Sequence, residues 1–179
     1  MNKSINSDFL NVMNERGFIH QITDKNNLDQ ELSTNIMTGY IGFDCTAPSL
    51  HVGSLIQIMM LRWFQKTGHK PIVLMGGGTT KIGDPSGKDS ARPVLSSENI
   101  EINQNNIRTI FEKFLKFGFS KNDAIMVNNS EWLERLNYVS FLRDFGPSFS
   151  VNKLINLESV KQRLDREQNL SFLEFNYSL

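Results

Sequence analysis

The chain has 179 residues, 39% of them hydrophobic, which suits one globular domain or one domain with an appendage. Lysine plus arginine and aspartate plus glutamate both total 19, so the net charge is zero and any RNA contact must be local. No apolar run has the length of a signal peptide core or of a membrane span. The only cysteine, Cys45, excludes an internal disulfide and suits a reducing compartment, so we expect a cytoplasmic protein.

The first 38 residues predict an N-terminal helical segment. Residues 8–18 place Phe9, Val12 and Met13 near one face and reach a stop signal at Gly17, which predicts an amphipathic packing helix. Residues 28–37 predict a second short helix. Thr38-Gly39 then turns the chain into a strand at residues 40–43.

The stretch from Tyr40 to Leu55 combines a short apolar strand, a polar loop and the first turn of a helix. This order presents free backbone N–H groups and the positive end of a helix dipole, which favour phosphate. Thr46 and His51 can donate hydrogen bonds to phosphate oxygens, and Gly42 and Gly53 leave room for a nucleotide against the backbone. The alternative is a strand-to-helix turn in which His51 only caps the helix.

A predicted helix after His51 is apolar almost all round and ends at Gly68, so we expect it to be largely buried. Residues 70–75 form a continuous apolar strand. Strand, buried helix and strand make the βαβ unit of a parallel sheet, which favours a nucleotide-binding α/β fold. Ligands of such sheets lie at the carboxyl ends of the strands, here after Phe43 and Met75.

The glycine-rich stretch 76–92 was compared with two generic motifs. The dinucleotide fingerprint is excluded because Lys81 stands at its third glycine position. The Walker loop is excluded because Ile82 stands at its first glycine and Asp89 follows Gly87-Lys88. A glycine-rich surface turn is the simplest alternative for this stretch.

Two motifs carry a resemblance to a known family. The stretch from Tyr40 to Leu55 resembles the ATP-binding signature of class I aminoacyl-tRNA synthetases, a Pro-Thr-x-x-x-Leu-His-x-Gly-His run after the first strand. Cys45 stands where bacterial tyrosyl enzymes commonly carry proline, and Ser54 replaces the second histidine. The run from Ile82 to Lys88 resembles the block after the second strand in bacterial and organellar tyrosyl-tRNA synthetases. The resemblance covers residues 17–177.

The second half of the chain is predominantly helical. A helix is predicted from residue 96 to Gly118 and a strand at residues 124–127. Asn128, Asn129 and Trp132 match an Asn-Asn-x-x-Trp block of the tyrosyl enzymes, and we expect Trp132 in the core. Helices are predicted at residues 138–145 and 151–166, and Ser171 opens a last one.

The resemblance implies a division of the chain. Residues 39–128 would form the first half of a Rossmann-like nucleotide-binding catalytic fold, with a parallel sheet flanked by helices. Residues 129–179 would form the helical connective insertion, which builds much of the homodimer interface in the family.

The implied reaction joins the tyrosine carboxylate to the α-phosphorus of ATP, which needs alignment and charge stabilisation rather than a protein nucleophile. The implied partners are L-tyrosine, ATP with its Mg²⁺, and tRNA(Tyr) through regions outside this chain, with no protein-bound metal and no membrane. The resemblance assigns Thr46 and His51 to the ATP phosphates, Gly42, Asp44, Gly53 and Ser54 to the nucleotide, and Lys88 and Arg92 to a loop that closes on pyrophosphate.

The same resemblance implies a tyrosine pocket. It places Tyr40 at the substrate hydroxyl, Asp84 and Tyr177 near the ammonium, Thr79 in the wall and Asn129 among the substrate-binding residues. Asp44 would face the ammonium or the adenylate. Two alternatives stay open, since Asp84 could be a turn residue before Pro85 and Lys88 and Arg92 could be solvated charges.

The sequence lacks two family features, the Lys-Met-Ser-Lys-Ser loop and the Gln-x-x-Asp positions that follow the residue matched by Tyr177. Two hypotheses follow from this. The chain is the N-terminal portion of a tyrosine-activating synthetase, or it is a truncated synthetase-like protein that keeps binding or dimerisation without catalysis.

Overall fold

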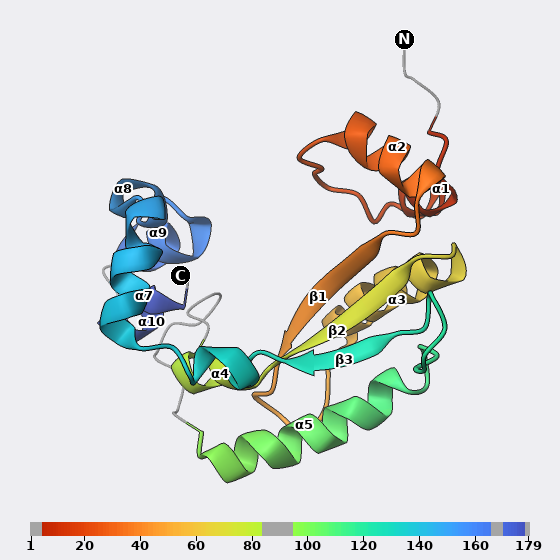
Figure 1. Cartoon of the computed structure of the whole chain (residues 1–179). Helices are drawn as coiled ribbons and strands as arrows, with labels where there is room; N and C mark the ends of the chain where they lie inside the picture. Colours follow the sequence, from red (N-terminus) through yellow and green to blue (C-terminus); the bar gives the residue numbers. More distant parts are fainter. Residues whose placement is uncertain (1–4, 84–94, 166–169, 178–179) are drawn as a thin grey trace. The chain divides into compact units, whose positions relative to one another are not determined.

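The computed structural model describes residues 5–83, 95–165 and 170–177 (Figure 1). The chain forms two compact units that interleave in the sequence. Unit 1 comprises Met1–Phe43, Ala47–Met75 and Asn103–Val127, and unit 2 comprises Asp44–Thr46, Gly76–Ile102 and Asn128–Leu179. The predicted domain boundaries at residues 39 and 129 stay a prediction.

A three-stranded sheet organises unit 1. Its strands are β1 (Thr38–Asp44), β2 (Lys70–Gly76) and β3 (Ile125–Asn128), in the order β1-β2-β3. Helix α3 (Val52–Lys66) connects β1 to β2, and the three strands run parallel (Figure 1). The predicted βαβ unit and the Rossmann-like parallel architecture are confirmed. Because β1 is an outer strand, one of its edges is unpaired within the part of the chain described here.

The remaining elements are helical. They are α1 (Asp8–Glu15), α2 (Lys25–Thr34), α4 (Gly77–Ile82), α5 (Ser97–Phe111), α6 (Ser130–Leu133), α7 (Tyr138–Asp144), the 3₁₀ turn η1 (Gly146–Ser148), α8 (Val151–Leu154), α9 (Glu158–Asp165) and α10 (Phe172–Asn176). No helix in these described segments combines the length and hydrophobicity needed to cross a membrane.

The N-terminal helices pack on α3 through a small apolar core. Leu10, Leu32 and Phe64 are buried together, and the partly buried Phe9 packs edge-on against Phe64 at 5.0 Å between ring centroids. The carboxylate of Asp29 on α2 accepts hydrogen bonds from backbone N–H groups just before α1, and these bonds lower its pKa. The predicted packing role of the first helix is confirmed.

His69 closes this core from the side of β2. It is 4% exposed and its ring lies 4.8 Å from that of Phe64. The backbone N–H of Met37 donates to His69 Nδ1 at 3.2 Å, so the ring is neutral with its proton on Nε2. Burial lowers the pKa of His69, because the charged form loses its hydration.

Helix α3 is less buried than its composition predicted. Ile58, Leu61 and Phe64 are buried, but Val52 is 82% exposed and Ile56 is 57% exposed. The expectation of a largely buried helix is therefore wrong for its first turns, which have apolar side chains without cover from the described residues.

The other differences lie in short helices. The short helices at residues 77–82 and 130–133 were not predicted, and Trp132 is 45% exposed rather than in the core. The helix predicted at 151–166 is two helices. The side chain of Asn156 donates to the carbonyl of Asn152, and the backbone N–H of Asn156 bonds to Lys153 instead, which ends the regular ladder.

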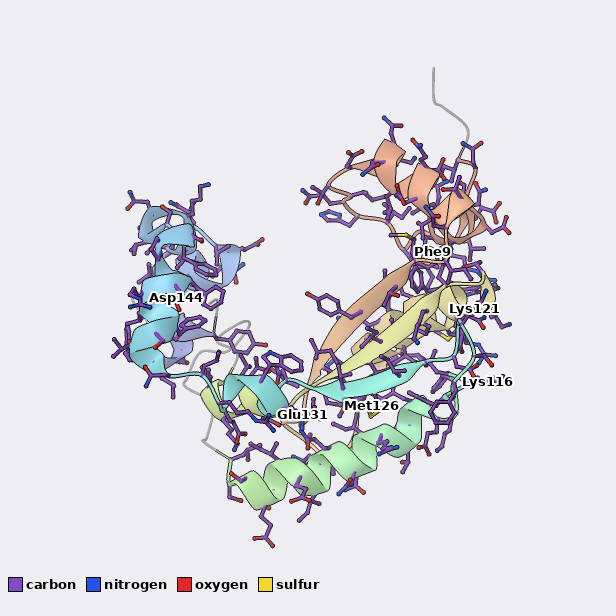
Figure 2. All side chains as sticks on the ribbon, in the orientation of Figure 1. Phe9, Lys116, Lys121, Met126, Glu131 and Asp144 are labelled. Atoms are coloured by element: carbon purple, nitrogen blue, oxygen red, sulfur yellow. The ribbon has the colours of Figure 1, made fainter. Side chains whose placement is uncertain are left out.

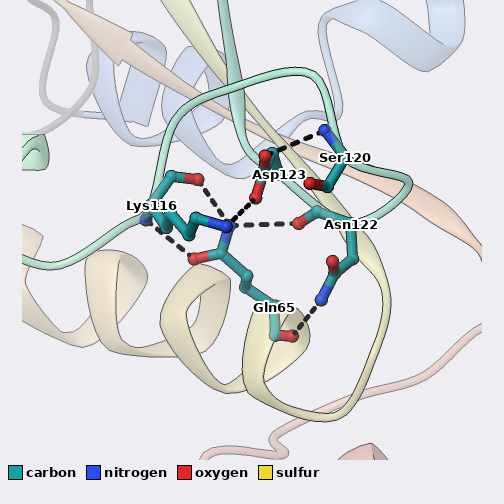
Figure 3. A network of polar contacts seen from close by, with 5 residues as sticks. All are labelled: Gln65, Lys116, Ser120, Asn122 and Asp123. Carbon is teal, nitrogen blue, oxygen red and sulfur yellow. Dashed lines mark hydrogen bonds and ion pairs between the residues drawn. The ribbon is translucent and has the colours of Figure 1, made fainter.

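Figure 3 shows how the loop before β3 is attached to α3. Gln65 donates to the carbonyls of Lys116 and Asn122 at 2.7 and 3.0 Å and accepts from the backbone N–H of Lys116. Asp123 accepts from the backbone N–H of Ser120 and pairs with Lys116 Nζ at 3.2 Å. These bonds lower the pKa of Asp123, the Ser120 backbone N–H having the largest effect. The loop from Lys116 to Asp123 is thus an ordered structure.

Candidate functional site

The carboxyl ends of β1 and β2 lead into unit 2, where a hydrogen-bonded cluster forms around Asp44. Thr79 Oγ1, on α4, donates to Asp44 Oδ1 at 2.7 Å. The hydroxyl of Tyr177, the C-cap residue of α10, donates to Asp44 Oδ2 at 2.9 Å. Both carboxylate oxygens of Asp44 therefore have a hydroxyl donor, which fixes the orientation of the carboxylate.

Asn129 extends the cluster to a fourth segment. This buried side chain donates from Nδ2 to Thr79 Oγ1 at 3.2 Å and accepts from the backbone N–H of Gly78 at 2.8 Å. The neighbouring Asn128 accepts from the backbone N–H of Gly77 at 3.2 Å. The Asn128-Asn129 pair at the end of β3 thereby binds the backbone N–H groups at the start of α4, whose N-cap residue Gly76 makes no side-chain capping bond.

Gly76 makes this arrangement sterically possible. A Cβ at residue 76 would overlap Asp44 Oδ1 and lie 2.6 Å from Thr79 Oγ1. Its φ of −82° is accessible to any residue, so the requirement for glycine is one of space alone. The glycine run after β2 lets α4 begin directly beside Asp44, so the alternative of a surface turn does not hold for residues 77–82.

Thr80 supports the same corner from inside. It is 5% exposed, donates to the carbonyl of Gly76 at 2.5 Å and accepts from the backbone N–H of Cys45 at 2.8 Å. Thr80 and Asn128 were not among the predicted site residues. The sequence could have indicated both residues, because each is next to a predicted site residue that follows the carboxyl end of a strand.

The capping box of α10 holds Tyr177 in place. Ser171 Oγ accepts from the backbone N–H of Glu174, and the Glu174 carboxylate accepts from the Ser171 backbone N–H at 3.0 Å. Glu174 is buried, and α10 lies against α4. The predicted helix start at Ser171 is confirmed, and it sets the side of α10 from which Tyr177 reaches Asp44.

The residues predicted to meet ATP lie mostly outside this cluster. Thr46, also in unit 2, is exposed. His51, in unit 1, is the N-cap of α3 and accepts from the backbone N–H of Gly53 at 3.0 Å, and its role at the ATP phosphates stays a prediction. A Cβ at Gly53 would overlap the His51 ring, whereas a Cβ at Gly42 would meet no atom within 4 Å.

The remaining predicted site residues lie on β1, on α3 or outside the described residues. Tyr40 on β1 is 69% exposed, and Ser54 lies in the first turn of α3 with its backbone N–H bonded to the His51 carbonyl. Asp84, Lys88 and Arg92 lie outside the described residues. Within the described parts of the chain, no three His, Cys, Asp or Glu side chains gather in a way that could hold a metal ion.

Comparison with known proteins identifies the family. The family model described as tRNA synthetases class I (W and Y) matches residues 32–179, and the chain belongs to this family. The chain is 61% identical over 171 residues to the tyrosine–tRNA ligase of Beijerinckia indica and 61% identical over 173 residues to that of Rhodospirillum rubrum. These matches cover 96% and 97% of this chain, but only 41% of each relative.

Solved structures agree with the fold. The C-terminally truncated mitochondrial tyrosyl-tRNA synthetase of Aspergillus nidulans superposes with a TM-score of 0.83 at 27% identity, over 94% of this chain and 50% of that one. The tyrosyl-tRNA synthetase of Archaeoglobus fulgidus, solved with L-tyrosine, gives a TM-score of 0.61 at 17% identity over 88% of this chain and 45% of that one. The second likeness supports the fold alone.

Proposed function

We propose that this chain supplies part of the active site of a tyrosine–tRNA ligase, which activates L-tyrosine with ATP and transfers it to tRNA(Tyr). The observation that carries the proposal is the cluster of Asp44, Thr79, Asn129 and Tyr177. These four residues come from four segments that are far apart in the sequence, and the family resemblance assigns each of them to tyrosine or to the nucleotide.

The chemistry of the cluster suits an amino-acid substrate. The Asp44 carboxylate attracts an ammonium group, and Thr79 and Tyr177 fix its direction before a ligand arrives. Thr46 and His51 are exposed donors that would reach the phosphates of ATP, where hydrogen bonds gain strength as charge builds in the transition state. Mg²⁺ would enter bound to those phosphates, and Asp84, Lys88 and Arg92 keep their proposed roles at the ammonium and the pyrophosphate.

A homodimer is the proposed assembly. Helices α7 and α8 and the turn between them expose large apolar side chains, with Val139 72%, Phe145 52% and Val151 62% exposed. Apolar side chains gathered in this way are typical of permanent interfaces. Light scattering on the chain and on its Val151→Glu variant tests the proposal, since the variant should be monomeric if this surface forms the dimer.

The test of the activity uses a protein in which this chain continues to the length of its relatives, assayed by tyrosine-dependent exchange of pyrophosphate into ATP. Tyr177→Phe should raise the KM for tyrosine about tenfold, because a hydrogen bond to a charged group contributes about 1.5 kcal/mol or more. The KM for ATP should stay unchanged. Thr109→Val, which removes one exposed hydroxyl from α5, is the matched control and should change neither constant.

Two results would contradict the proposal. Absence of tyrosine-dependent exchange in the extended protein would remove the ligase activity itself. Equal changes in the KM values of tyrosine and ATP would show that Tyr177 supports the fold and does not select the amino acid.

A further inference from the structure

The neutral chain concentrates positive charge in one part of unit 1. The end of α3 and the start of β2 (residues 62–70), together with the end of α5 and the loop after it (residues 108–123), contain only two acidic residues, Glu112 and Asp123. The basic residues in these two segments are Arg62, Lys66, Lys70, Arg108, Lys113, Lys116 and Lys121. We call this set the basic surface.

The two segments are joined by hydrogen bonds as well as by composition. Arg62 donates to the carbonyl of Phe114 at 2.7 Å, and Gln65 bonds to backbone groups of Lys116 and Asn122. Lys116 and Lys121 are labelled on the loop between α5 and β3 in Figure 2. The basic surface is therefore one connected region.

An aromatic ring stands in the middle of the loop. Phe119 is fully exposed, with a relative exposure of 108%, and lies between Lys116 and Lys121 in the sequence. The loop that presents it is ordered, because Gln65 and Asp123 hold it at both ends (Figure 3). A Cβ at Gly118 would meet the Asp123 carboxylate, so the loop closes tightly just before the ring.

Only some of the basic side chains in this region have a partner within the fold. Lys116 pairs with Asp123, and Lys66 lies over the Trp63 ring at 5.1 Å, with Arg16 of α1 at 4.8 Å from the same ring. Lys113 and Lys121 are exposed, and neither forms an ion pair with another described residue. A fixed, exposed ring flanked by such cations has no evident use in stabilising unit 1.

We propose that this surface binds single-stranded nucleic acid, with one unpaired base stacked on Phe119 and the neighbouring phosphates held by Lys113 and Lys121. Stacking on an aromatic side chain combined with cations along the backbone is the general means by which proteins hold single strands. A lone ring on a short ordered loop offers too little apolar area for a stable protein interface or for membrane insertion.

This proposal does not depend on the ligase activity. The loop precedes the amino end of β3, and Lys70 begins β2, whereas Asp44 ends β1. None of the seven basic residues is among those assigned to tyrosine or ATP, and the test below needs neither substrate.

The test uses fluorescence anisotropy on the full 179-residue chain with labelled ten-nucleotide oligouridine and oligodeoxythymidine, the two arms that distinguish RNA from DNA. We expect binding that weakens with added salt. Phe119→Leu should weaken binding about 5- to 150-fold, because it removes a stacked ring and keeps an apolar side chain, and Phe119→Tyr should bind as the parent does. Since Phe119 is exposed, the thermal unfolding of both variants should match the parent.

The cations are tested by charge-matched pairs. Lys113→Gln with Lys121→Gln should lower the slope of log affinity against log salt by about 1.4, since each phosphate contact on a single strand contributes about 0.7. Lys25→Gln with Lys161→Gln removes the same charge from exposed positions on α2 and α9 and should leave the slope unchanged.

Several outcomes would overturn the proposal. They are no binding of either oligonucleotide, equal losses in the two lysine pairs, equal affinity of Phe119→Leu and the parent, and tighter binding to anionic vesicles than to oligonucleotides. Preference for a duplex over a single strand of the same length would also overturn it, because a paired base cannot stack on Phe119.

Discussion

Single residues in unit 2 show how strongly this site depends on small differences in space. Asp44, Thr79, Asn129 and Tyr177 were all predicted from the family resemblance, and the structure brings them into hydrogen-bond contact. Their contacts with one another were not predictable, because sequence patterns do not specify side-chain directions. Gly76, which makes room for Asp44, carried no signal beyond membership of a glycine run.

Two glycines test this steric reading. Gly76→Ala should lower the free energy of unfolding by about 1–3 kcal/mol, because the new methyl group overlaps Asp44 and the backbone there leaves little room to shift. Gly42→Ala, in a strand with open space around it, should be neutral or stabilising by up to about 1 kcal/mol. Urea unfolding of both variants measures the difference. Equal stabilities would mean that unit 2 rearranges around residue 76 without cost.

Helices and strands were predictable where the pattern was long. The three strands, α1, α3 and α7 appear within a few residues of their predicted positions because each has a regular apolar face or a clear end signal, whereas α5 begins as predicted but ends at Phe111 instead of near Gly118. The short helices α4 and α6 were missed, since four to six residues give no periodicity. The break between α8 and α9 was missed because it depends on the side chain of Asn156 competing for a backbone carbonyl.

The packing of α1, α3 and β2 around His69 predicts that the stability of the fold depends on pH. The pKa of His69 is lowered in the folded protein, so the unfolded chain binds more protons between the folded pKa and the ordinary value near 6.5. Stability should therefore be complete above pH 6.5 and fall as the pH drops below it. Urea midpoints between pH 7.5 and 5 measure this loss.

A matched pair of variants tests whether His69 causes this pH dependence of stability. His69→Asn keeps an acceptor for the Met37 N–H but cannot titrate, so its midpoint should not fall over this range. His20→Asn, at an exposed position, should behave as the parent. The lowered pKa values of Asp29 and Asp123 affect stability only below about pH 4, where protonation weakens their hydrogen bonds. They therefore do not contribute to the change in stability between pH 7.5 and 5. A parental pH dependence in His69→Asn would exclude His69 as the cause.

For the whole molecule, the fold class and the family were predictable, because two motifs at the expected separation define them. The positions of the site residues in space were not predictable, because the motifs give only their order along the chain. The chain spans about 41% of the length of its relatives, and Asp84, Lys88 and Arg92 lie outside the described residues.

The 179-residue chain alone should give no tyrosine-dependent exchange of pyrophosphate into ATP. It has the cluster around Asp44, but its sequence contains neither the Lys-Met-Ser-Lys-Ser loop nor the Gln-x-x-Asp residues that the family resemblance implies. Alignment of both substrates supplies about 7–11 kcal/mol of catalysis in well-built sites, and a partial site forfeits much of it. Exchange within about tenfold of the extended protein would show that residues 1–179 already hold the complete catalytic unit.

The unpaired edge of β1 has a consequence for the time course of synthesis. In a protein as long as the relative from Beijerinckia indica, about 240 residues follow this chain. At 5–20 residues per second the ribosome needs about 12–50 s to make them. Among the described residues the outer edge of β1 has no strand partner, so during that interval this edge could pair with another nascent chain.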